Sequence, residues 1–193
     1  MQFGEVKKFI LGKLKKELPK HLSYHSVEHV KDVFDATKYI ADREGVKGDD
    51  LKMLLTAALF HDSGFLNGLN DHEKQSCNIA KEYLPLYQYT PEQIKKICGM
   101  IMATKIPQTP KNHLEQIICD ADLDYLGRDD FYSIGNKLFA ELSMYGMINT
   151  VDEWNQLQVR FLESHHYFTE TSITLRKAAK EKHLKKIKKL TGN

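Results

Sequence analysis

Apolar residues recur every three or four positions along nearly the whole chain, and this spacing constrains the fold more than any other feature. In residues 23–43, the positions on the apolar face are Val30, Val33, Phe34, Thr37 and Ile40. Such spacing gives a helix one apolar face, which must be buried against other helices. No stretch alternates apolar and polar residues in a way that predicts a strand. We therefore expect an all-α fold, a compact helical bundle.

Turn-forming residues divide the pattern into segments. The clearest helix start is Thr90-Pro91-Glu92, where a cap residue is followed by proline at the first helical position and then by an acid. A length of 193 residues suits one hydrophobic core, so we expect a single domain over residues 1–193. The expected helices cover residues 1–18, 23–43, 51–62, 73–84, 91–104, 113–127, 129–146 and 151–165, followed by a basic C-terminal helix.

Composition indicates a soluble cytoplasmic protein. Apolar residues make up 41% and charged residues 28% of the chain, a balance typical of globular proteins. The longest nearly apolar run, MLLTAALF, is too short to cross a bilayer, and the N-terminus lacks the apolar region of a secretory signal. The three cysteines are widely spaced and form no CxxC pair, which argues against disulfides and thiolate zinc sites. We expect no membrane association.

The C-terminal segment is strongly basic. From Arg176 to Asn193 eight lysines and arginines face one acid, whereas the rest of the chain has 20 basic and 25 acidic residues. One interpretation is a module that binds nucleic acid or an acidic partner. The alternative is an amphipathic helix that docks through Leu184, Ile187 and Leu190 and keeps its lysines in water. Because no aromatic residue alternates with the lysines, we favour the docked helix and consider a nucleic-acid partner unlikely.

The most informative chemical feature is the pair His61-Asp62, set between His29 upstream and Asp122 downstream. Two imidazoles and two carboxylates suit a divalent ion and leave coordination positions for water and substrate. Adjacent side chains diverge by about 100° inside a helix, so His61 and Asp62 can converge on one ion most easily at a helix end. Asp122 lies in the apolar frame IICDADLDYL, where a buried acid is costly unless it is paired or bound to metal. This pattern predicts a metal-dependent hydrolase.

These residues resemble the HD superfamily of metal-dependent phosphohydrolases, whose signature is a histidine, a His-Asp pair and a distant aspartate on a helical core. The resemblance covers about residues 21–128 and implies a bundle of the HD-domain type, on which the helices of residues 129–193 pack. It implies that one divalent ion (Mn, Mg, Fe, Ni, Co or Zn) is held by His29 in YHSVEHVKDV, His61 and Asp62 in LFHDSGF, and Asp122 in DADLDYLG. Asp120, two residues earlier in the last motif, is the alternative to Asp122.

The resemblance also implies catalytic roles beside the ion. His25, on the same helix face as His29, would donate a proton to the leaving group, and Asp62 would orient the attacking water while it binds metal. The alternative role for His25 is a hydrogen bond to Glu28 or Asp32. Candidates for binding substrate phosphate are Lys105, Arg128 and His72, and for the first two an exposed solubilising role is the alternative.

Departures from the family pattern narrow the function. Thr104 stands where several members have a histidine, so a second ion would be held only weakly. Ser63-Gly64-Phe65 replaces the Glu-Asp pair of alarmone hydrolases, and the Gly-Tyr-Pro motif of cyclic dinucleotide phosphodiesterases is absent. We expect hydrolysis of a phosphate ester, of a nucleotide or a related small metabolite. A metal-binding regulatory domain without turnover is the other alternative, and a homo-oligomer is left open.

Two further features are assigned structural roles. The pair His165-His166 is expected on a helix, where adjacent side chains point apart, so it is not assigned to the metal site. Trp154, Phe161 and Leu162 are expected in the core.

Overall fold

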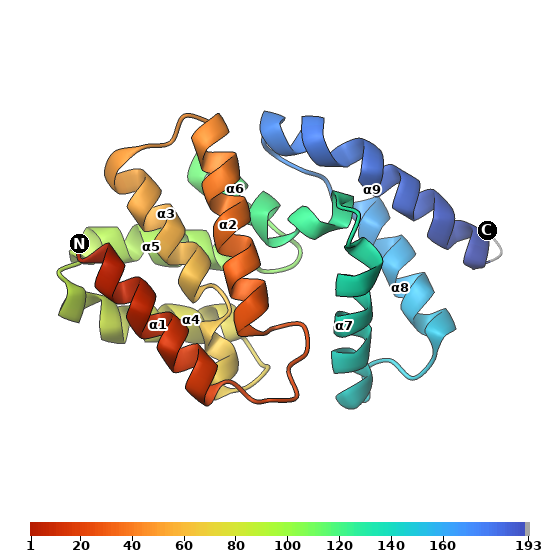
Figure 1. Cartoon of the computed structure of the whole chain (residues 1–193), viewed down its shortest axis with the longest axis horizontal. Helices are drawn as coiled ribbons and strands as arrows, with labels where there is room; N and C mark the ends of the chain where they lie inside the picture. The colour runs from red at the N-terminus through yellow and green to blue at the C-terminus, as the bar shows by residue number, and fades with distance from the viewer. Residues whose placement is uncertain (192–193) are drawn as a thin grey trace.

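The computed structural model describes residues 1–191, which form nine α-helices and three short 3-10 helices and contain no β-strand (Figure 1). The all-α prediction is confirmed. In chain order the elements are α1 (Phe3–Glu17), α2 (Val27–Arg43), α3 (Gly48–Phe60), η1 (Ser63–Asn67), α4 (His72–Tyr83), η2 (Leu84–Tyr87), α5 (Pro91–Ala103), α6 (His113–Asp122), η3 (Asp124–Gly127), α7 (Phe131–Met144), α8 (Val151–Ser164) and α9 (Glu170–Leu190).

Side-chain caps explain where several of these helices begin. Ser26 accepts a hydrogen bond from the backbone N–H of His29, so α2 starts at Val27, later than the expected residue 23. The predicted start of α5 is confirmed: Thr90 and Gln93 cap each other's backbone N–H groups.

One expected helix is interrupted at the site. Residues 113–127 were expected to form a single helix, but α6 ends at Asp122 and the 3-10 helix η3 follows. The break occurs at Leu123, whose φ of −109° and ψ of 18° leave the helical region. Asp122 is therefore presented at a helix end and not on a buried helix face.

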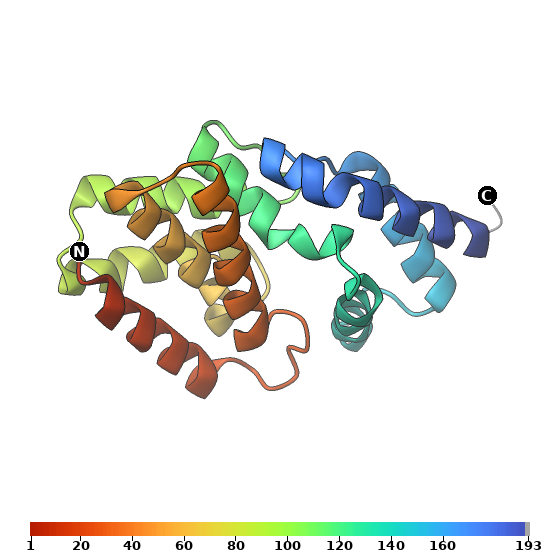
Figure 2. The ribbon, with the colours of Figure 1, turned by 45° about the horizontal axis from the view of Figure 1, so that its top comes forward.

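The helices gather in two groups, each with its own apolar core. In Figures 1 and 2, α1–α6 form the N-terminal group and α7–α9 form the other, with η3 between them. Fully buried side chains of the first core include Ile10, Leu54, Leu59, Ile97 and Ile101. The second core consists of Tyr24, Leu123, Tyr125, Leu126, Phe131, Val159, Leu162 and Ile187. The two groups face each other across η3, and their assignment to one domain stays a prediction.

A close backbone approach fixes α9 on η3. A Cβ atom at Gly127 would lie 2.4 Å from the backbone oxygen of Arg176, so only glycine allows this contact. Nearby, the Arg176 guanidinium donates to both oxygens of the Asp124 carboxylate, at 2.7 and 3.1 Å. This paired geometry holds the C-terminal helix over the segment that follows Asp122.

The basic segment is part of a longer helix than the charge pattern suggests. Within α9, Ile187 is buried and Leu184 is partly buried, but Leu190 is 67% exposed and does not dock. Lys180 is also buried, contrary to the expectation that these lysines lie in water, and donates to the backbone oxygens of Leu162 and His165. No helix in residues 1–191 is both long enough and apolar enough to cross a membrane.

Candidate metal centre

The His-Asp pair lies at a helix end, as its spacing predicts. Helix α3 stops at Phe60, and Asp62, with φ −104° and ψ 7°, begins the turn into η1. His29 projects from the first turn of α2, and Asp122 is the last residue of α6. Three separate segments therefore bring four side chains to one place.

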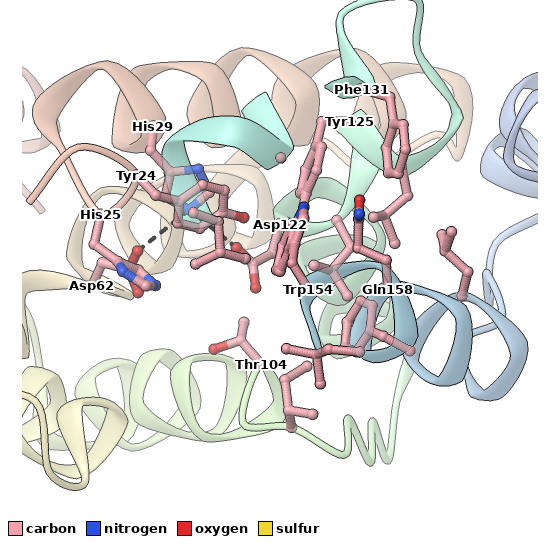
Figure 3. A pocket seen from close by; sticks show the side chains of 18 of the residues that line it. Tyr24, His25, His29, Asp62, Thr104, Asp122, Tyr125, Phe131, Trp154 and Gln158 are labelled. Carbon is pink, nitrogen blue, oxygen red and sulfur yellow. Dashed lines mark ion pairs between the residues drawn. The ribbon is translucent and has the colours of Figure 1, made fainter. Parts of the chain in front are cut away.

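The four side chains meet at short distances, and Figure 3 shows three of them, His29, Asp62 and Asp122. The Nε2 atom of His29 lies 3.3 Å from Asp62 Oδ2 and 3.3 Å from Asp122 Oδ1. The Nε2 atom of His61 lies 3.2 Å and 3.4 Å from the same two oxygens. The two Nε2 atoms are themselves 3.3 Å apart. His29, His61 and Asp122 alone form a cluster that could hold a metal ion.

These separations suit a coordination shell. Ligand atoms bound at about 2.0–2.2 Å from a zinc-like ion lie roughly 3.0–3.5 Å from their neighbours in octahedral or tetrahedral geometry. The measured separations of 3.2–3.4 Å fall within this range. In addition, the buried Asp62 Oδ2 atom has no hydrogen-bond partner within residues 1–191. This oxygen lies 3.2–3.3 Å from the two Nε2 atoms but accepts no well-formed hydrogen bond, and a bound cation would satisfy it.

The orientation of His61 also favours metal binding. Its Nδ1 atom lies 2.8 Å from the carbonyl oxygen of Ala58, which can only accept a hydrogen bond. This contact assigns the proton to Nδ1 in the neutral ring and leaves the lone pair of Nε2 directed at the cluster.

A second layer of contacts holds the His-Asp pair. The Ser76 hydroxyl donates to the carbonyl oxygen of His61 at 2.6 Å and accepts from the backbone N–H of Gly64 at 2.7 Å. A Cβ atom at Gly64 would lie 1.9 Å from the backbone oxygen of His72, so glycine is required where η1 approaches α4.

The histidines and the aspartates shift each other's ionisation. Burial opposes protonation of His29, but its contacts with Asp122 and Asp62 outweigh burial and raise the pKa of the ring to about 9. Burial and the Asp62 charge likewise compete at His61, and the pKa of this ring is raised well above its usual value. For Asp122, burial is outweighed by contacts with His29 and His61, which lower the pKa of the carboxyl to about 2. In the metal-free cluster the carboxylates therefore favour protonation of the rings, and the rings favour ionisation of the carboxylates.

The alternative aspartate has a different environment. Asp120 points away from the cluster and accepts hydrogen bonds from the backbone N–H groups of Phe168 and Thr169, at 2.9 and 2.8 Å. It also accepts from the Thr169 hydroxyl at 2.7 Å. Because Thr169 caps α9, Asp120 anchors the start of that helix.

His25 stands beside the cluster and is held by a residue that the sequence interpretation missed. Its Nδ1 atom bonds to Oε1 of the buried Glu141 on α7, not to Glu28 or Asp32 as the alternative proposed. Oε2 of Glu141 accepts hydrogen bonds from the backbone N–H groups of Tyr24 and His25, at 2.8 and 3.2 Å. The available sequence signal was an acid spaced three residues after Leu138 on the apolar face of its helix.

Aromatic stacking fixes the position of the His25 ring. Phe65 of η1 stacks on both His25 and His72, with ring centroids 4.0 and 4.3 Å away, and the two histidine centroids are 6.0 Å apart. The Nε2 atom of His72 lies 3.7 Å from Asp62 Oδ1. Both histidines therefore border the cluster without joining it.

A cavity of about 210 Å³ opens from the cluster toward α7 and α8 (Figure 3). His25, His72 and Thr104 line it near the cluster. Trp154, Phe161 and Leu162, which were expected only to fill the core, form part of its far wall. His165 and His166 are not among its lining residues, and they follow the end of α8 instead of lying on a helix.

The other two substrate-binding candidates are engaged elsewhere. Lys105 is exposed and forms an ion pair with Asp71 at 2.9 Å. Arg128 pairs with Asp32 at 2.9 Å, Asp130 at 2.7 Å and Asp124 at 3.5 Å. Neither lines the cavity, and their roles in substrate binding stay predictions.

Comparisons with known proteins agree with this architecture. The family model described as HD domain matches residues 26–124, just over half of the chain. A predicted HD superfamily hydrolase from an uncultured Thermotogales bacterium has a similar structure, with 20% identity, a TM-score of 0.62, and coverage of 95% of this chain and 88% of the other. A protein from Lactobacillus plantarum is 16% identical, with a TM-score of 0.67 over 100% of this chain and 98% of its own. No curated protein gives a significant match.

Proposed function

Because this chain belongs to the HD domain family, we propose that it is a metal-dependent phosphohydrolase that cleaves a phosphate ester of a small molecule. The observation that carries the proposal is the convergence of two imidazole nitrogens and two carboxylate oxygens at the end of a cavity. A phosphoryl group entering the cavity would meet this cluster directly.

His29, His61, Asp62 and Asp122 would hold one divalent ion. Such an ion, when bound, lowers the pKa of a coordinated water and polarises a phosphoryl oxygen. The Asp122 side chain is 15% exposed, against 1% for His61 and 7% for His29 and Asp62, so substrate would approach from the side of Asp122. The Ala58 carbonyl and Ser76 hydroxyl would keep the His-Asp pair in place through the reaction.

His25 would supply the proton for the leaving group. Glu141 binds its Nδ1 atom, and because the two ring nitrogens lie on opposite edges, Nε2 is directed away from Glu141. His25 lines the cavity, so a proton on Nε2 can reach an ester oxygen placed there. The buried carboxylate orients the ring in the way that an aspartate orients a catalytic histidine in hydrolases.

The test is metal-dependent release of phosphate. Metal-free protein is supplied in turn with manganese, magnesium, iron, nickel, cobalt and zinc, and phosphate release is measured on a panel of phosphate esters. We expect turnover with at least one metal, and its loss in His61→Ala and Asp62→Ala. The control is His113→Ala, which removes an exposed histidine outside the cavity lining. Equal, negligible metal content in wild type and both site variants would refute the assignment.

A further inference from the structure

The cavity joins two chemically different regions in one continuous space. One end holds His29, Asp62 and Asp122 of the cluster. The other end, formed by α7 and α8, is lined by Phe131, Leu138, Trp154, Leu157, Phe161 and Leu162. Figure 3 shows Phe131 and Trp154 on the side of the cavity opposite His25 and Asp62. A molecule whose phosphoryl group reaches the cluster would place the rest of its body against apolar side chains.

Apart from its histidines, the ionisable side chains that line the cavity and are charged near neutral pH are acidic. Asp62, Glu73 and Asp122 are among the lining residues, whereas none of the lining residues in the described part of the chain is a lysine or arginine. Two carboxylates already balance the charge of one divalent ion. A polyphosphate would therefore bring several negative charges into a space with no further fixed cation, and burying unpaired charge is costly.

We propose that the substrate is a phosphate monoester whose alcohol carries an apolar group the size of an aromatic ring, and that this group occupies the end of the cavity lined by Trp154, Leu157 and Phe161. This inference rests on the proposed phosphohydrolase function. It differs from the nucleotide that the family resemblance suggests, because a nucleotide would bring its polar ribose, or further phosphates, into this apolar region.

The reaction is a hydrolysis that needs no co-reactant other than water. A bond forms between the water oxygen and phosphorus, and the bond between phosphorus and the alcohol oxygen breaks. A proton from His25 goes to the departing alcohol oxygen, and a proton from the water restores the histidine. The products are inorganic phosphate and an apolar alcohol.

Binding can be measured without turnover, because the chain has one tryptophan and it lines the proposed subsite. The probe is 4-nitrobenzylphosphonate, which cannot be hydrolysed and whose nitroaryl ring quenches indole fluorescence. We expect saturable quenching of Trp154 in the metal-loaded protein. Hydroxymethylphosphonate, which has the same phosphonate but no ring, should compete at least about 10-fold more weakly, since burying a ring is favourable. Equal affinity for the two phosphonates would overturn the inference.

Turnover tests the substrate class directly. Benzyl phosphate and glycerol 3-phosphate release alcohols of similar acidity, so a difference in kcat/KM reports recognition of the alcohol. We expect benzyl phosphate to be favoured on the order of 10- to 100-fold, and AMP and ATP to be poorer than benzyl phosphate. Equal rates for the first pair, or faster cleavage of AMP or ATP, would overturn the substrate class alone. Absence of phosphate release from every ester with every metal would overturn the proposed function itself.

A variant that narrows the apolar end of the cavity tests whether the preference for benzyl phosphate arises there. Gly135 lines the cavity, and a Cβ atom there would lie 3.5 Å from Gln158 Oε1 and 3.7 Å from Trp154 Cζ2. Gly135→Leu should therefore lower kcat/KM for benzyl phosphate far more than for glycerol 3-phosphate, so that the ratio of the two values falls close to one. Gly12→Leu is the matched control, because nothing lies within 4 Å of its Cβ position. The inference is overturned if Gly135→Leu folds and keeps the wild-type ratio, or if it loses both activities equally. If the leucine variant does not fold, the smaller Gly135→Ala is tested in its place.

Discussion

Two aspartates in one helix have separate roles at the scale of single residues. Asp120 and Asp122 are two positions apart on α6 and point to different sides of it. Asp122 faces the histidines, and Asp120 holds the start of α9. The geometry therefore places Asp122, and not Asp120, in the cluster. Substitutions at the two positions should have different effects.

We expect Asp122→Asn to lose bound metal and activity while the protein stays folded. Asp120→Asn should keep its metal, but the amide replaces an oxygen that accepts from Thr169, so the free energy of unfolding should fall by about 1–3 kcal/mol. Elemental analysis and urea unfolding of both variants measure the two effects. The opposite pattern, with metal lost only from Asp120→Asn, would transfer the ligand role to Asp120.

If His25, held by Glu141, donates the proton, substitutions at either residue should impair proton transfer and leave metal binding intact. His25→Ala should keep its metal and lose roughly 10²- to 10⁴-fold in turnover of an alkyl phosphate, whose leaving group needs a proton. It should lose much less on a nitrophenyl ester, whose leaving group does not. Glu141→Gln should show the same selectivity with a smaller loss, because Oε1 still binds Nδ1 but the charge is gone. Equal losses on both esters would show that the dyad only supports the fold.

Metal binding should release protons near neutral pH. Because the pKa of His29 is raised to about 9 and that of His61 is raised as well, the two rings hold protons at pH 7 that a bound ion would displace. An ion must displace these protons, so its apparent affinity should rise with pH up to about 9, by about tenfold per pH unit for each proton displaced. Calorimetry in buffers of different ionisation enthalpy counts the protons. Binding without proton release would contradict this assignment of charge.

At the scale of elements, glycines mark where helices come closest, and two of them predict opposite effects. Gly127→Ala places a methyl group 2.4 Å from the backbone of Arg176, which should push α9 from η3 and destabilise the protein by about 1–3 kcal/mol. Gly135→Ala meets its neighbours at ordinary contact distances within α7, so the gain in helix propensity should stabilise the protein by up to about 1 kcal/mol. Urea unfolding of the two variants measures both, and equal effects would contradict the packing described at Gly127.

At the scale of the whole molecule, the site ties together segments that are far apart in the chain. His29, His61 and Asp122 come from α2, the end of α3 and the end of α6, so an ion bound to them links three segments of the N-terminal group. At a metal concentration of 100 Kd, binding adds about 2.7 kcal/mol to stability. In a chain of this length that raises Tm by roughly 5–10 °C. Thermal unfolding with and without metal tests this, and His61→Ala should show no such rise.

Local patterns in the sequence predict the helical class, and the motifs that resemble the HD superfamily predict which side chains form the cluster. Apolar spacing and turn residues located the helices, because each helix needs one buried face and a defined end. The adjacency of His61 and Asp62 predicted a helix end, and α3 does end immediately before them. These features are local, so they can be interpreted without knowing what packs on what.

Which distant groups meet depends on how the helices pack. Glu141 reaches His25 across more than one hundred residues of sequence, and no local pattern indicates such a pairing. The break at Leu123 and the burial of Lys180 depend on how η3, α8 and α9 pack, and helix propensity alone predicts neither. Trp154 and Phe161 have the spacing of core residues, but they line a cavity because the facing helices leave space beside them. Periodicity identifies the apolar face of a helix. Long-range packing decides whether that face contacts neighbouring side chains or lines a cavity.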